Sequence, residues 1–186
     1  MNNVTLEDIM TIHQSKTLEF LNNDGTDSQT ISQSIKNFNS NSQNHLKGDV
    51  WDKERAKYAV YDEALSKHSS IANEMASTIQ SIISELQAAM NGYDSIDISK
   101  LDEIKDQKRF NLKTFSFEPV YDNAALQVQL NAELQVLAEL EKLITTIEII
   151  KAICDKGEAK LNSLLNEMSA IAAGIESITP SEAVAV

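Results

Sequence analysis

The side chains able to carry out acid–base, nucleophilic or metal chemistry are few in this sequence and lie far apart. The three histidines are His13, His45 and His68, and no two of them are one helical turn apart, as a metal site on one helix face requires. The sequence has no glycine-rich phosphate loop and no glycine-flanked serine elbow. The single cysteine, Cys154, cannot form an internal disulfide and falls on an apolar helix face, which is typical of a small core residue. These observations predict no catalytic site, no cofactor and no metal.

One polar segment, residues 22–27, resembles the start of a calcium loop but lacks a required ligand. An EF-hand loop ends with a glutamate at its twelfth position, and counting from Asn22 places Gln33 there. The same segment is a poor helix former. Either two helices meet within it, or one long helix passes Gly25 at a close contact. We favour one nearly continuous N-terminal helix.

Composition and charge limit the classes of partner. The chain has 186 residues, 42% of them hydrophobic, and a net charge of −12. An acidic surface of this kind disfavours both nucleic acid and anionic lipid. The N-terminus lacks the basic start of a signal peptide, and charges interrupt the most apolar stretch, residues 137–153. We therefore expect no nucleic-acid partner and no stable membrane insertion, and export would need another route.

Long helices must position whatever function the chain has, because its 5 glycines and 2 prolines leave few turns. Apolar residues recur at alternating steps of three and four through residues 51–92, which predicts a helix about 60 Å long. A compact chain of this size has a radius of gyration of only about 16 Å. The sequence therefore predicts an all-α, elongated helical rod. The central part of the apolar row, called the seam below, consists of Tyr61, Leu65, His68, Met75, Ile79 and Ile82.

The remaining segments complete this outline. A turn with capping residues at 93–99 precedes a helix at 100–108, and alternating aromatics predict an extended connector over residues 109–122. From residue 123 the helical period returns, with a break at Gly157 expected to give two C-terminal helices. Residues 179–186 read as a tail or a linker cut short.

The segment that joins the first two long helices has the most informative residues. Gly48 is expected to supply a left-handed backbone that ends the first helix, and Asp49 to cap the second. Leu46 and Trp51 would close this end of the hairpin with apolar side chains. Any helical hairpin could use such a turn.

Leu46, Gly48 and Trp51, set between two long helices near the N-terminus, resemble the motif of the LXG domain, the N-terminal export module of polymorphic toxins from Gram-positive bacteria. The resemblance covers residues 1–178. It implies a non-catalytic targeting domain that binds small WXG-like helical helper proteins, for which the seam is the candidate surface. It also implies delivery of an attached antibacterial toxin to the ATPase of the type VII secretion system. The protein would be cytoplasmic before export and secreted afterwards.

Substrates of that system carry a Tyr-x-x-x-Asp/Glu export signal after the second helix of the hairpin. Tyr93 with Asp97 fits this spelling and position, and we expect one helical turn to place both on one face. Tyr58 with Asp62 fits the spelling alone and is less favoured. Two other readings stay open: an ordinary helix-end aromatic with a capping acid, or a signal supplied by a helper protein.

Two functions of other classes are weighed against this reading. A membrane-active, pore-forming helical toxin is the alternative, supported only by the Ala- and Ile-rich residues 169–175. A stand-alone enzyme is the other possibility, and no residues in the sequence form a catalytic motif that would support it.

Overall fold

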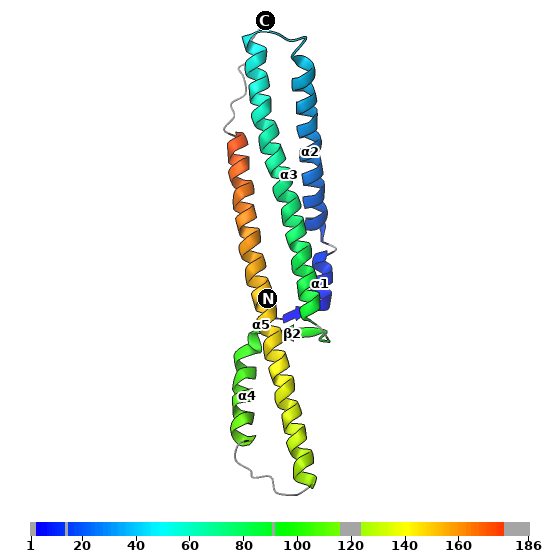
Figure 1. Cartoon of the computed structure of the whole chain (residues 1–186), viewed down its shortest axis with the longest axis vertical. Coiled ribbons are helices and arrows are strands. Elements are labelled where there is room, and N and C mark those ends of the chain that lie inside the picture. Colours follow the sequence, from blue (N-terminus) through cyan, green and yellow to red (C-terminus); the bar gives the residue numbers. More distant parts are fainter. Residues whose placement is uncertain (1–2, 14, 91, 116–123, 177–186) are drawn as a thin grey trace. The chain divides into compact units, whose positions relative to one another are not determined.

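The computed structural model describes residues 3–13, 15–90, 92–115 and 124–176, and almost all of them are helical. The all-α class is therefore confirmed, while the rod-like shape stays a prediction. The elements are β1 (Asn3–Thr5), α1 (Leu6–His13), α2 (Lys16–Ser42), α3 (Asp49–Ala89), β2 (Ser95–Asp97), the 3₁₀ helix η1 (Ile98–Lys100), α4 (Leu101–Phe115) and α5 (Ala124–Glu176) (Figure 1). They form two compact units, described in turn: unit 1 consists of Met1–Ile12 with Ile82–Lys156, and unit 2 of His13–Ser81 with Gly157–Val186.

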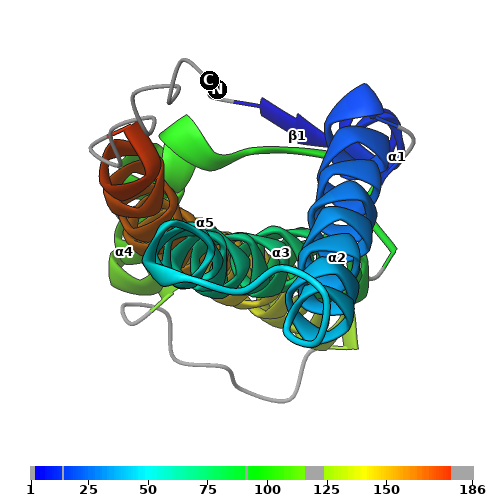
Figure 2. The same ribbon diagram turned by 90° about the horizontal axis from the view of Figure 1, so that it is seen from above.

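Unit 2 is built on the antiparallel pair α2 and α3, which lie side by side (Figures 1 and 2). The α2 residues that face α3 recur at steps of three and four, apolar at first and then small or polar. They are Leu18, Leu21, Gly25, Ser28, Ser32, Ile35, Asn39 and Ser42, of which all but Ile35 and Asn39 are buried. Small residues let the two backbones approach closely, and hydrogen bonds replace apolar contacts along this interface.

Gly25 lies at a close contact between the two helices. The Ser69 hydroxyl donates to the Gly25 carbonyl oxygen at 2.7 Å. A Cβ at position 25 would lie 2.8 Å from Oδ1 of Asn73. The prediction that a helix passes Gly25 at a close contact is thus confirmed. The expectation of one nearly continuous helix from the N-terminus is wrong at one point, because Ser15, with extended backbone, separates α2 from α1.

The C-terminal part of α5 adds a third helix to unit 2. Leu164 of α5 is fully buried, and the Lys160 ammonium group forms an ion pair with the Glu74 carboxylate of α3. The hydrogen bond from Lys160 to that carboxylate raises the pKa of the lysine. The predicted break at Gly157 is wrong, because α5 continues through this buried residue. The apolar row keeps its helical spacing on both sides, and its burial outweighs the roughly 1 kcal/mol helix cost of one glycine.

Unit 1 begins with a small antiparallel sheet that the sequence patterns did not predict. Strand β1 pairs with β2 in the register Val4 opposite Ile96. Thr5 caps α1, since its hydroxyl accepts a hydrogen bond from the Asp8 amide at 3.0 Å and donates to the Asp8 carboxylate at 2.7 Å. Three-residue strands are too short for a periodic signal, so only the pairing partner reveals them. The core of this unit is Ile9, Ile83, Leu86, Met90, Ile96, Leu137, Ile144, Ile147 and Ile150.

Helix α4 packs antiparallel to α5 and corrects the predicted connector. Residues 109–115 continue α4, so the extended structure expected there is wrong; residues 116–122 lie outside the described part. Two lysines one turn apart hold α4 to α5: Lys105 lies 2.6 Å from Glu148, and Lys108 pairs with Glu141. Phe110 and Leu112 of α4 are exposed, and their alternation with polar residues suggested an extended segment instead. The predicted tail at 179–186 also lies outside the described residues.

Candidate functional site

The turn between α2 and α3 has the positive φ predicted for Gly48, with a value of 113°. Two details of the prediction are wrong. Helix α2 already ends at Ser42, where the Leu46 amide donates to the Ser42 carbonyl oxygen at 2.8 Å. Asp49 is the first residue of α3, and the Asp52 amide donates to the Gly48 carbonyl oxygen at 3.1 Å, so Gly48 takes the N-cap position.

Arg55 holds this turn in place, a role that sequence reasoning missed. One guanidinium nitrogen, Nη1, donates to the Leu46 carbonyl oxygen at 2.9 Å and to the Ser42 hydroxyl at 3.4 Å. The other, Nη2, lies 2.5 Å from the Asp52 carboxylate. The arginine thus joins the end of α2, the turn and the first turns of α3. An arginine near a helix start is normally solvated, so the sequence carried no signal for this contact.

The apolar side chains at the turn are only partly covered. Leu46 is half-buried, whereas Trp51 keeps 39% of its surface exposed and the neighbouring Val50 56%. The expectation that Leu46 and Trp51 together close the hairpin is therefore wrong for Trp51. The tip of the hairpin presents an aromatic and an aliphatic side chain on its surface, a pairing common in protein contacts.

Substitution of Gly48 by valine is expected to lower the free energy of unfolding by more than about 1 kcal/mol, because a β-branched residue is strained at positive φ. No atom lies within 4 Å of a Cβ built at Gly48, so the cost would be backbone strain and not a clash. Urea denaturation followed by circular dichroism would measure it. Gly174→Ala is the matched control, since this helical glycine also has open space around it and should gain stability. Unchanged stability of Gly48→Val would contradict the assigned turn geometry.

The seam on α3 is half-buried at all six predicted positions. The buried α3 residues are other positions near these six: Ser69, Ile71, Ala72, Ala76, Ile83 and Leu86. His68 is engaged with α2, since its Nδ1 lies 3.1 Å from the Ser28 hydroxyl and its Nε2 lies 3.5 Å from the Asp24 carboxylate. Serine, histidine and aspartate are the residue types of a hydrolytic triad. Ser28, however, lies in the middle of helix α2, and its side chain is buried against α3. Their geometry joins α2 to α3.

The two Tyr-x-x-x-Asp pairs have separate surroundings. Tyr58, which is partly exposed, makes an edge-to-face contact with Phe38 of α2 at 5.3 Å between ring centroids. Asp62 accepts a hydrogen bond from Ser32 and lies 3.6 Å from the Lys36 ammonium group. Both members of this pair therefore stabilise the contact between α2 and α3.

Tyr93 and Asp97 do not share a helical face, and this expectation is wrong because residues 95–97 form strand β2. The Lys142 ammonium group lies 5.3 Å from the centroid of the Tyr93 ring, within range of a cation–π contact. Asp97 caps η1, accepting hydrogen bonds from the Ser99 hydroxyl at 2.6 Å and the Ser99 amide at 3.0 Å. These bonds lower the pKa of Asp97, the side-chain bond having the larger effect.

Cys154, the remaining residue singled out in the sequence, is half-buried on α5. Burial raises the pKa of its thiol, and the neighbouring carboxylate of Asp155 adds to the effect. A thiol with a raised pKa is a weak nucleophile at neutral pH. Within the described ranges, no three acidic, histidine or cysteine side chains are arranged to bind a metal ion.

Comparison with known proteins gives no relative for this chain. No protein-family model matches it, and neither a curated protein nor a solved structure does. In the described part of the chain, no helix has a stretch both long and apolar enough to cross a lipid bilayer.

Proposed function

We propose that this chain is a non-catalytic export module that binds small helical helper proteins and directs an attached antibacterial toxin to the type VII secretion system. The observation that carries the proposal is the turn with Leu46, Gly48 and Trp51. It joins helices of 27 and 41 residues, and Gly48 has positive φ. This is the arrangement that the resemblance to the LXG domain implies for its motif.

The partners of this module are WXG-like helical helpers, and the ATPase of the secretion system reads the assembled hetero-oligomer. Large apolar side chains exposed on several helices support a role in protein contacts; they include Phe20, Ile31, Val60, Phe110, Val128 and Leu165. The protein is cytoplasmic before export and secreted through this system afterwards. Tyr93 with Asp97 remains the candidate export signal, with Tyr58 and Asp62 less favoured.

Co-expression with the small helical proteins encoded beside its gene tests helper binding. We expect the chain alone to self-associate or to be unstable, and to become monodisperse with its helpers, because partners that bind only the folded state raise its apparent stability. Light scattering and thermal melts of both samples are the measurements. A lone chain that stays monomeric, with a melting temperature unmoved by the helpers, contradicts helper binding. Leakage of liposomes by the purified chain would instead favour the pore-forming alternative.

A further inference from the structure

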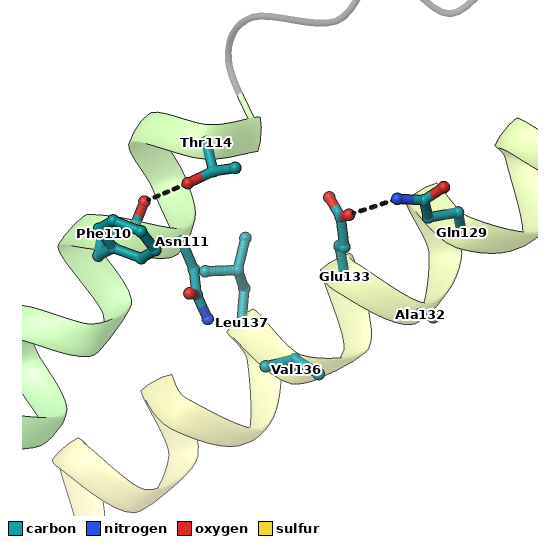
Figure 3. Close-up of a pocket in the computed structure, with 8 residues that line it drawn as sticks. All are labelled: Phe110, Asn111, Thr114, Gln129, Ala132, Glu133, Val136 and Leu137. Atoms are coloured by element: carbon teal, nitrogen blue, oxygen red, sulfur yellow. Dashed lines mark hydrogen bonds between the residues drawn. The ribbon is translucent and has the colours of Figure 1, made fainter.

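Two hollows of unit 1 adjoin along α5. The first, of about 300 Å³, lies between α4 and α5 and has Phe110 on its α4 side (Figure 3). The second, of about 500 Å³, has Tyr93 on its border. Ala132 and Val136 line both hollows, so the two adjoin along α5, and together they are treated as one groove. The α5 residues of this groove, called the α5 groove below, run from Gln129 to Leu143.

The helical period arranges the residues of the α5 groove as an apolar floor with an acidic rim. Its floor consists of Ala132, Val136, Leu140 and Leu143, spaced by three and four residues. The same period places Glu133 on one side of this floor and Glu139 on the other. Figure 3 shows Leu137 directed toward α4 and Glu133 one turn along, at the open side of the first hollow. The floor is accessible, since 47% of the Val136 surface is exposed.

The two rim carboxylates differ from the acids that hold α4 to α5. Glu141 and Glu148 form ion pairs with lysines of α4. Glu133 accepts a hydrogen bond from the Gln129 amide at 3.2 Å, and neither it nor Glu139 forms a salt bridge among the described residues. Charges that flank an apolar helix face determine which partner helix can bind there. An acidic rim selects a basic partner.

We propose that the α5 groove binds one amphipathic helix of another protein, with basic residues on both flanks of its apolar stripe. The groove spans about 21 Å along the helix axis, which matches roughly four turns of a docked helix. Glu133 and Glu139 are about 9 Å apart along that axis, which is the separation of two lysines six residues apart, on opposing flanks of a helix stripe. This inference deepens the proposed function and rests on it for the existence of a helical partner.

Charge argues against the other occupants of the groove. A second copy of this chain has a net charge of −12 and would oppose acids to the rim. An anionic lipid surface would be repelled by the same carboxylates. A basic helix gains two ion pairs beside a desolvated apolar contact, which is where charge complementarity contributes to both affinity and specificity.

The test uses the purified full chain and a designed 18-residue, fluorescein-labelled peptide with leucines at steps of three and four and lysines on both flanks. A matched peptide has glutamates in place of the lysines. Fluorescence anisotropy should show binding of the lysine peptide and weaker binding of the glutamate peptide. The double substitution Glu133→Lys with Glu139→Lys should lower the affinity for the lysine peptide by about tenfold or more and raise the affinity for the glutamate peptide. Asp155→Lys with Glu158→Lys, at exposed positions of the same helix, changes the net charge equally and should leave both affinities nearly unchanged.

A further variant, Val136→Asp, should abolish peptide binding without loss of helical content by circular dichroism, because Val136 is already partly exposed. Equal binding of the two peptides overturns the proposal, as does an equal loss of affinity in the Asp155 and Glu158 control. Helpers that still co-purify with a chain whose groove binds no peptide would overturn the groove and leave the proposed function standing. Specific peptide binding by a chain that no helper binds would support the groove and contradict the proposed function.

Discussion

Replacement of Ile147 by alanine is expected to lower the free energy of unfolding by about 2–5 kcal/mol. The side chain has no exposed surface and lies in the core of unit 1. Truncation would remove its transfer free energy and leave a cavity that packed helices fill only in part. Urea denaturation followed by circular dichroism at 222 nm would report the change as a lower midpoint.

Ile149→Ala is the matched control for this prediction, because Ile149 is on the same helix and 47% exposed. Its cost should be well under half that of Ile147→Ala, since less apolar surface leaves water at this position on folding. Equal costs at the two positions would contradict the assigned inner face of α5.

Arg55→Met is expected to lower the free energy of unfolding by about 1–3 kcal/mol, the cost of leaving the partly buried Leu46 and Ser42 acceptors without a donor. The Arg55 side chain is only 12% exposed, and its guanidinium group bonds to Leu46, Ser42 and Asp52, so its loss removes every contact that joins α2, the turn and α3 through this side chain. Thermal and urea denaturation would measure the loss.

The second arginine offers a closely matched control. Arg109 also pairs with an aspartate three residues before it, Asp106, but its side chain is 74% exposed. Exposed ion pairs contribute little, so Arg109→Met should leave the free energy of unfolding nearly unchanged. A small effect of Arg55→Met, no larger than that of the control, would show that Arg55 does not hold the turn.

The long helices could be predicted because their apolar residues repeat at helical spacing and few glycines or prolines interrupt them. The first part of α4 was predicted as a helix over residues 100–108, but its continuation through residues 109–115 was not, because Phe110 and Leu112 alternate with polar residues there and both stay exposed. The polar side of α2 gave only a weak helical signal. Ser28 and Ser32 are buried there because α3 supplies hydrogen-bond partners, and that pairing is not visible in one segment alone.

The sequence predicted some residues of the candidate site correctly, but it predicted their geometry less well. The positive φ of Gly48 follows from the turn pattern, whereas Arg55 reaches the turn only through tertiary packing. Tyr93 and Asp97 were wrongly predicted to share a helical face. Strand β2 forms only because it pairs with β1, some ninety residues earlier, and that partner is not visible in the local sequence. The α5 groove could not be predicted either, because its α4 border was expected to be an extended connector.

The central claim, that the chain is an export module, is tested most directly by its secretion. The full chain, fused to a reporter and co-expressed with its neighbouring small helical proteins, would be followed in a Gram-positive host that has a type VII system. We predict that the reporter accumulates in the medium of the parent strain and stays in the cells of a strain without the secretion ATPase. Equal accumulation in both media, or retention in both strains while the helpers bind the chain, would contradict the claim.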